Sequence, residues 1–274
     1  MTKIVSANDL EIVISTKDRQ SLDFLLRMFP YRHFSSFNLL IINQSENAVL
    51  VSDFPTVRII NVAERGLSKS RNMAIKNAIK TICLIADDDV VYLQNFDEEI
   101  INAFNQNLDA AIITFNHQRI GLDKPQNNSK KPYRHSKKTI YDVCSIEIAF
   151  RLNSIRENNL FFDKYFGLGS YFEIAEEFLF LRGAIKLNLK LYFSPHVIVS
   201  HPLLSSGEDQ GNDKLIYARA ALFYKLKSNL VYIWLLKYLF FLVRHKYIKW
   251  NQFLEKYQVG LYGIDKCKEL INFK

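Results

Sequence analysis

Short apolar runs alternate with polar segments along the first part of the chain. Runs with the length of buried strands occur at residues 11–16, 38–43, 57–61, 81–86 and 110–115. Helices are predicted at residues 21–28, after residue 68 and at residues 95–107. In the second of these, Ile75, Ala78 and Ile79 fall on one face of a 3.6-residue period. The alternation predicts an α/β fold with a mostly parallel central sheet and helices on both faces.

The next part of the chain is less regular. Residues 116–139 are polar, basic and rich in Asn, Lys and Pro, so we expect a mobile loop or a poorly ordered connection there. Beyond it, strands are predicted at residues 143–151 and 196–200 and a helix at about 175–186. An aromatic stretch at residues 161–172 contains Gly167 and Gly169, which suit a turn.

Positive charge is concentrated near the end of the chain. Residues 211–274 carry twelve Lys and Arg against four Asp and Glu, an excess that equals the whole net charge of +8. They include the most apolar run, Leu230–Val243, which Lys237 interrupts and which is shorter than the ~20 residues of a membrane-spanning helix. With flanking basic and aromatic side chains, this run predicts a helix lying on an anionic membrane surface. A buried helix that closes the core is the alternative, and both can hold at once.

Composition excludes several classes of protein. With 49% hydrophobic and 23% charged residues, disorder is excluded as the main state. Aromatic residues near the end of the chain cluster in the apolar run instead of alternating with basic residues, so no nucleic-acid partner is expected.

The start of the chain lacks a signal-peptide pattern, and Cys83, Cys144 and Cys267 form no C-x-x-C pair. We therefore expect a reduced, cytoplasmic protein without structural zinc.

Polar residues follow three of the predicted strands. They are Thr16-Lys17-Asp18, Asn43-Gln44-Ser45 and Asp87-Asp88-Asp89. Ligands of parallel sheets bind at the carboxyl ends of the strands. The sequence therefore predicts a binding site where these residues meet.

The three consecutive aspartates are the strongest chemical signal in the sequence. Side chains alternate in an extended chain, so Asp87 and Asp89 are expected to face one way and Asp88 the other. Mg²⁺ is usually held by one or two carboxylates together with substrate phosphates. A solvated acidic turn is the alternative, but three adjacent like charges after a buried strand favour a compensating metal ion.

The segment ERGLSKSRNMAIKNA (residues 64–78) is followed by IADDDV (residues 85–90). Together these segments closely resemble glycosyltransferase family 2, whose members have the GT-A fold. Residues 12–19, IVISTKDR, resemble the first strand and base-binding loop of that family. Residues 166–169, FGLG, followed by Glu176-Glu177, are similar to its acceptor-side signature with the general base. The order of these segments also matches, from residue 10 to about residue 201.

The resemblance implies a role for individual residues. The nucleotide of the donor would be bound by Thr16, Lys17, Asp18, Asn43, Gln44, Arg71, Asp87 and Asp88. A divalent metal ion, Mn²⁺ or Mg²⁺, would be held by Asp89, with Asp87 and His201 as further ligands. The general base would be Glu177, with Glu176 as the next candidate.

The match with the family pattern has two departures. Many members carry acidic residues where this chain has Asn43-Gln44, and Asp is commoner than Glu at position 177. Acidic residues in the first turn of a helix are also favoured by the helix dipole, which by itself accounts for one of Glu176 and Glu177. The assignment of the base therefore rests mainly on the resemblance.

The function implied is an inverting transfer of a hexosyl or N-acetylhexosaminyl group from a nucleotide-sugar, a UDP-sugar, to a hydroxyl. The acceptor would be a glycan or a lipid-linked molecule in bacterial surface-polysaccharide synthesis, at the inner face of the plasma membrane. Residues 1–115 would bind the donor, residues 116–205 the acceptor, and residues 206–274 would form a basic, amphipathic helical segment. The alternatives are a metal-dependent nucleotidyl or phosphoryl transferase, although no glycine-rich phosphate loop is present, and a catalytically silent module that binds nucleotide-sugar or membrane.

Overall fold

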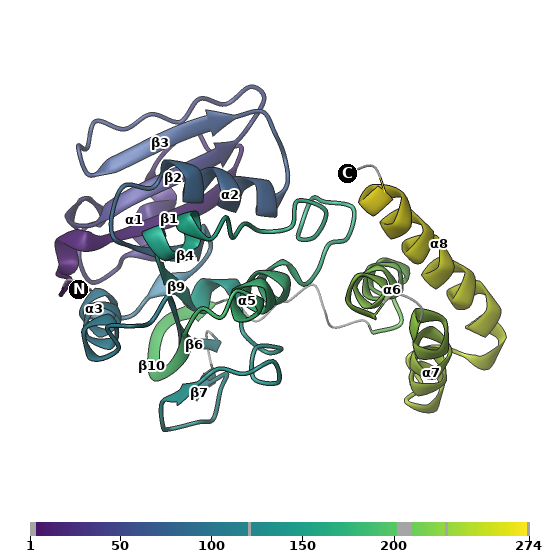
Figure 1. The fold of residues 1–274 in the computed structure, drawn as a ribbon. Helices are drawn as coiled ribbons and strands as arrows, with labels where there is room; N and C mark the ends of the chain where they lie inside the picture. Colours follow the sequence, from purple (N-terminus) through teal and green to yellow (C-terminus); the bar gives the residue numbers. More distant parts are fainter. Residues whose placement is uncertain (1–3, 120–121, 202–209, 228–229, 273–274) are drawn as a thin grey trace. The chain divides into compact units, whose positions relative to one another are not determined.

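The chain forms two compact units. The computed structural model describes residues 4–119, 122–201, 210–227 and 230–272 (Figure 1). Unit 1 comprises Met1–Asp163 and Glu176–Leu203, and unit 2 comprises Lys164–Ala175 and Leu204–Lys274. Unit 1 contains the sheet, and unit 2 is mainly helical.

Four parallel strands form one side of the sheet, in the order β3-β2-β1-β4. They are β1 (Leu10–Lys17), β2 (Asn38–Gln44), β3 (Val57–Val62) and β4 (Ile82–Asp87). All four were predicted from their apolar runs. In the register, Thr16 lies opposite Asn43 and Ser15 opposite Asp87, so the carboxyl ends of β1, β2 and β4 meet at one edge.

The other side of the sheet is mixed. It contains β9 (Ile148–Arg151), β6 (Ile112–Arg119), β10 (Leu191–His201) and β5 (Val91–Tyr92). Strand β9 is antiparallel to both β4 and β6, whereas β10 is parallel to β6 and β5 is antiparallel to β10. Two further strands, β7 (Leu122–Pro125) and β8 (Tyr133–Arg134), pair with β6 and β10.

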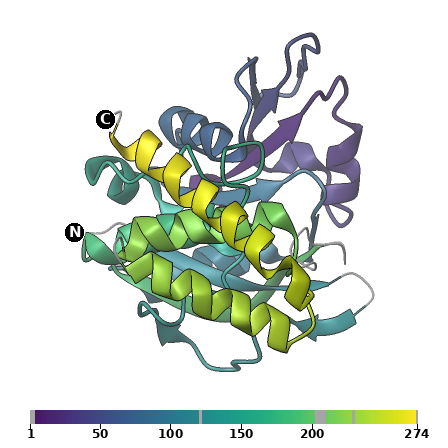
Figure 2. The ribbon, with the colours of Figure 1, turned by 90° about the vertical axis from the view of Figure 1, so that its right-hand side faces the viewer.

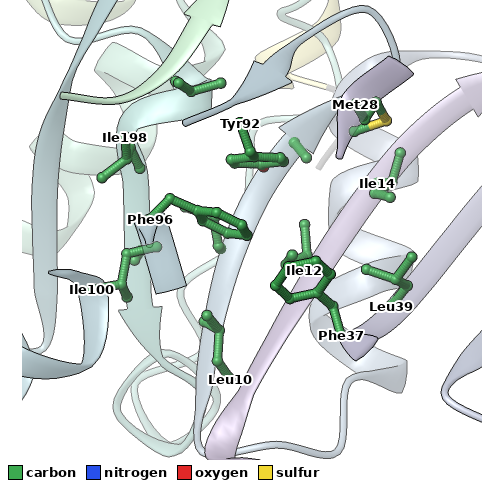
Figure 3. Close-up of a cluster of buried hydrophobic side chains, with 14 of the residues drawn as sticks. Leu10, Ile12, Ile14, Met28, Phe37, Leu39, Tyr92, Phe96, Ile100 and Ile198 are labelled. Carbon is green, nitrogen blue, oxygen red and sulfur yellow. The ribbon is translucent and has the colours of Figure 1, made fainter. Parts of the chain in front are cut away.

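Helices cover both faces of this sheet. They are α1 (Asp23–Met28), α2 (Leu67–Asn77), α3 (Phe96–Gln106), α4 (Leu152–Glu157) and α5 (Glu176–Lys186). Alternate β1 residues such as Ile12 and Ile14 pack with Met28 of α1 and Phe96 of α3 in the main apolar cluster (Figure 3). Helix α2 packs against β1 and β2 and contributes no residue to that cluster. The sheet is therefore buried on both sides, which explains its continuous apolar runs.

Three local predictions were wrong. Ile79 is not on the buried face of α2, because the helix ends at Asn77 and Ile79 is 65% exposed. Residues 116–139 are not simply a loop, because β6 continues to Arg119 and the segment contributes β7 and β8 to the sheet. The predicted strand at residues 143–151 begins only at Ile148, after a 3₁₀ turn at Ser145–Glu147.

Unit 2 is built around three helices, α6 (Asp213–Lys227), α7 (Val231–Arg244) and α8 (Phe253–Asn272). In Figure 2, α8 crosses α6 and α7. A Cβ atom at Gly263 of α8 would lie 2.2 Å from the carbonyl oxygen of Tyr217, so this close approach to α6 requires glycine. The turn at residues 166–169 has positive φ angles of 101° at Gly167 and 74° at Gly169, as expected for a glycine turn.

Helix α7 is the apolar run identified in the sequence. Its buried face consists of Val231, Leu235, Leu239 and Leu242, which form a core with α6 and α8. The buried-helix alternative is therefore realised for one face of α7. Within the described ranges, no helix is both long enough and apolar enough to span a bilayer.

Candidate active site

The three aspartates at the carboxyl end of β4, Asp87, Asp88 and Asp89, each contact a different partner. Asp88 accepts a hydrogen bond from the Thr16 hydroxyl and pairs with Arg19, whose Nη2 and Nε lie 2.7 and 2.9 Å from its Oδ2. Thr16 and Asp88, predicted to share a site from separate strands, are thus in direct contact. Arg19 was quoted within the first-strand motif but was not predicted as a site residue.

Arg71 is the buried centre of the site. It projects from α2, its side chain is 2% exposed, and it lies 3.0 Å from Oδ1 of Asp87 and 3.0 Å from Oε1 of Glu176. The Ser145 hydroxyl accepts a third hydrogen bond at 2.8 Å. Burial alone would lower the pKa of the Arg71 guanidinium, but the neighbouring Asp87, Glu176 and Glu177 raise it, so the side chain remains a cation.

These two arginines change the interpretation of the aspartate triplet. Arg19 balances the charge of Asp88 and Arg71 that of Asp87. Charge repulsion in the triplet therefore does not by itself require a metal ion. Asp87 and Asp89 also do not share a partner, contrary to the expected alternation, because Asp87 turns to Arg71 and Asp89 approaches His201.

Of the three consecutive aspartates, Asp89 has the most exposed side chain and is the most accessible to a ligand. Its side chain is 55% exposed, and its Oδ1 lies 3.8 Å from Nε2 of His201. Partial burial and the charges of Asp87 and Asp88 raise the pKa of Asp89, and His201 lowers it. No group of three His, Cys, Asp or Glu side chains suited to a metal ion occurs within the described ranges. A carboxylate with one imidazole fits a divalent cation whose remaining ligands are substrate phosphates and water.

The two acids at the start of α5 are distinguished by their surroundings. Glu176 is buried, and its carboxylate forms an ion pair with Arg71. Glu177 has a buried Oε2 with no hydrogen-bond partner. Burial, followed by the charge of Glu176, raises the pKa of Glu177 to about 8. A carboxylate with this pKa and a free oxygen is suited to accept a proton near neutral pH.

Asn43 and Gln44 hold loops at this edge of the sheet. Asn43 is fully buried and exchanges hydrogen bonds of 3.1 Å with both the backbone N–H and the carbonyl of Arg19. Gln44 donates to the carbonyls of Glu64 and Gly66 at 2.6 and 3.1 Å. Their amide groups thus fix the backbone on either side of the site.

Lys17 and Asp18 form the outer rim. Asp18 adopts a positive φ of 54°, and Arg65 lies 3.2 Å from one of its carboxylate oxygens. Hydrogen bonds from Arg65, and then from Ser45, lower the pKa of Asp18. Lys17 is exposed at the end of β1. Arg65 and Ser145, like Arg19, join the site without having been predicted, and the only signal in the sequence was the need to balance several acidic side chains.

Comparisons with known proteins agree with this architecture. Residues 40–170, just under half of the chain, match the family model described as glycosyl transferase family 2. None of the curated proteins compared with this sequence matches it.

Among solved structures, the chain is similar to S. aureus TarS 1-349, at 13% identity over 94% of this chain and 80% of that one, with a TM-score of 0.55. The same fragment in complex with UDP-GlcNAc gives 14% identity over 94% and 80% of the two chains and a TM-score of 0.58. The same fragment in complex with UDP is 15% identical over 88% of this chain and 72% of that one, with a TM-score of 0.54. At these identities, the likeness establishes the fold, which is of the predicted GT-A type.

Proposed function

We propose that this protein is an inverting glycosyltransferase that transfers a sugar from a UDP-sugar to a hydroxyl of a glycan or lipid-linked acceptor in surface-polysaccharide synthesis. The observation that carries the proposal is Glu177, a half-buried carboxylate with a raised pKa and a free buried oxygen, close to the charges of Arg71 and Glu176. The family match and the UDP and UDP-GlcNAc complexes of the similar TarS structures support this reaction class.

Different side chains of the site would carry out proton transfer, positioning and metal binding. Glu177 takes the proton of the acceptor hydroxyl as its oxygen attacks the anomeric carbon in line, which inverts that centre. Arg71 fixes Glu176 and Asp87, and the Thr16, Arg19 and Asp88 group presents polar atoms to the nucleoside. Asp89 and His201 would hold the divalent ion, Mn²⁺ or Mg²⁺, which when bound supplies positive charge to the departing nucleoside diphosphate.

The metal assignment predicts the behaviour of Asp89→Asn. UDP binding in the presence of Mn²⁺ should weaken about tenfold or more, which corresponds to at least ~1.4 kcal/mol, because a neutral amide is a poor ligand for a hard cation. Isothermal titration calorimetry with UDP, with and without Mn²⁺, measures this effect. Asp109→Asn is a matched control, because Asp109 is similarly exposed and pairs with Lys190. Undiminished Mn²⁺-dependent binding by Asp89→Asn would reject the assignment.

We further propose that unit 2 holds the enzyme at an anionic membrane on the cytoplasmic side. On α7, the face opposite the core exposes Ile233, Leu236 and Phe240, at 58%, 40% and 53%. Basic side chains accompany this face at Lys237 and Arg244. Apolar side chains flanked by basic ones are typical of helices that lie at the lipid interface.

Leu236→Glu combined with Phe240→Glu should release the protein from vesicles of phosphatidylglycerol and phosphatidylcholine. Each apolar side chain withdrawn from lipid costs about 1.5–3 kcal/mol, so the partition coefficient should fall at least ~100-fold. Neither residue belongs to the buried core of unit 2, so that core should stay intact. Vesicle sedimentation gives the measurement, and Ile79→Glu, at an exposed apolar residue of unit 1, is the control. Equal sedimentation of all variants would exclude this surface.

A further inference from the structure

Unit 1 contains a cavity that the proposed roles of the site residues do not use. Its volume is about 470 Å³, within the range of about 300–1,000 Å³ typical of small-molecule sites. It lies between β6, β8 and β10 and the segment that connects β7 to Glu147. The first part of this connecting segment, residues 126–139, lies within the stretch 116–139 that the sequence predicted as a loop.

The cavity and the candidate active site share one 3₁₀ turn. Ser145 and Glu147 belong to the same 3₁₀ turn, in which each residue advances about 2 Å. Ser145 accepts a hydrogen bond from Arg71 in the active site, and Glu147 lines the cavity. A molecule in the cavity would therefore contact the same turn that Arg71 contacts from the active site.

The lining combines neutral polar side chains with aromatic rings. Gln126, Asn127, Asn128, Ser129 and Thr139 provide amide and hydroxyl groups. Tyr133 and Phe193, stacked with centroids 4.7 Å apart, contribute an aromatic wall. Sugar rings present hydroxyl groups at their edges and apolar C–H groups on their faces, so this mixture of partners suits them.

Charge argues against a phosphate in the same cavity. Among the described residues, its lining includes Asp142 and Glu147 but only one cation, Lys138. Glu147 is 3% exposed and is bound by His117 Nδ1 at 2.8 Å and by the backbone N–H of Cys144 at 2.9 Å. The part of the lining that the structure describes therefore has no cluster of cations of the kind that phosphate recognition requires.

We propose that this cavity binds a neutral sugar unit of the acceptor, an inference that rests on the proposed glycosyl transfer. The acceptor hydroxyl would then come from a glycan whose sugar occupies the cavity beside the 3₁₀ turn. The acceptor is thus recognised through uncharged hydroxyl groups and not through a phosphate.

Saturation-transfer difference NMR tests the inference with glucose, galactose, N-acetylglucosamine and rhamnose as probes, in the presence of saturating UDP. At least one of these sugars should give signals with the wild-type protein. The signals should fall about threefold or more in Gln126→Ala combined with Asn128→Ala, because each lost hydrogen bond weakens binding a few-fold. Both residues are exposed in the described structure, so the fold should be retained. Lys131→Ala, in the same segment but outside the lining, is the control and should match the wild type.

The outcomes separate this inference from the proposed function. UDP binding by calorimetry should be the same in the wild type, the double variant and the control. If UDP binds but none of the four sugars gives a signal, or the signals survive in the double variant, the cavity is not the acceptor site, although the donor site stands. Displacement of the sugar by inorganic phosphate would also overturn the inference. If UDP does not bind at all, the proposed function itself fails.

Discussion

Glu177→Gln should lower the rate of sugar transfer by about 10²–10⁴-fold, the usual contribution of a general base. Glutamine keeps the size of the side chain but cannot accept the acceptor proton at its amide nitrogen. The rate is measured as UDP release from a UDP-sugar in the presence of Mn²⁺, and UDP binding by calorimetry should remain within about twofold of the wild type. Glu157→Gln, at an exposed acid on α4, is the matched control and should be fully active.

Retained activity in Glu177→Gln would remove Glu177 from its role. If the wild type releases no nucleoside diphosphate from a panel of UDP- and GDP-sugars, the chain is a binding module and not a transferase. Transfer of a phosphoryl or nucleotidyl group instead would be recognised by the product, because the bond cleaved would lie at phosphorus and not at the anomeric carbon.

The raised pKa of Glu177 adds a pH dependence. The base acts as the carboxylate, so kcat/KM should rise about tenfold per pH unit up to pH 8 and level off above it, following the pKa of about 8.

The folded-state pKa of Glu177 lies above the ordinary value of 4.5, so the stability contributed by the protonated group is present below pH 4.5 and lost as pH rises towards 8. Glu177→Gln should therefore show a flatter decline of Tm between pH 6 and pH 9 than the wild type.

Arg71→Met should produce the largest loss of stability, about 3–5 kcal/mol in the free energy of unfolding. The substitution leaves the carboxylates of Asp87 and Glu176 without the cation that both contact at 3.0 Å. Denaturant unfolding of purified protein measures this loss. Adding Asp87→Asn and Glu176→Gln to Arg71→Met should restore part of the stability, because no unpaired buried charge then remains.

Arg65→Met serves as the control for Arg71→Met. Arg65 pairs with Asp18 at 3.2 Å, but both side chains are about half exposed, so this variant should unfold at nearly the wild-type denaturant concentration. Equal midpoints for the Arg65 and Arg71 variants would show that Arg71 does not carry the buried ion-pair network.

The sequence predicted the parallel half of the sheet and the edge at which the site lies. Strands buried on both faces leave continuous apolar runs, and the polar residues that end β1 and β4 meet in the contact between Thr16 and Asp88. The direction of β9 could not be predicted, because a short apolar run is the same in a parallel and an antiparallel ladder. The extension of β6 into residues 116–119 was not predicted, because these side chains are polar and give no apolar strand pattern. Their backbone nevertheless pairs with β10.

The electrostatic partners were the least predictable part of the site. Arg71 and Glu176 are 105 residues apart, and Arg19 and Asp88 are 69 apart, so no local pattern links them. The sequence could place acids at the strand end, but it could not show that arginines balance two of them. For the same reason, the sequence could not distinguish the surroundings of the two glutamates. Glu176 forms an ion pair with Arg71, whereas the buried Oε2 of Glu177 has no hydrogen-bond partner.

A nucleoside diphosphate should bind at the carboxyl edge of β1 and β4, with its phosphates beside Asp89. Crystals soaked with UDP and MnCl₂, with diffraction data collected at the manganese absorption edge, measure where both bind. An anomalous peak is expected within bonding distance of the Asp89 carboxylate and of oxygens of the diphosphate, with the nucleoside next to Asp88. A nucleotide bound elsewhere, or a manganese peak that contacts neither Asp89 nor phosphate, would contradict it.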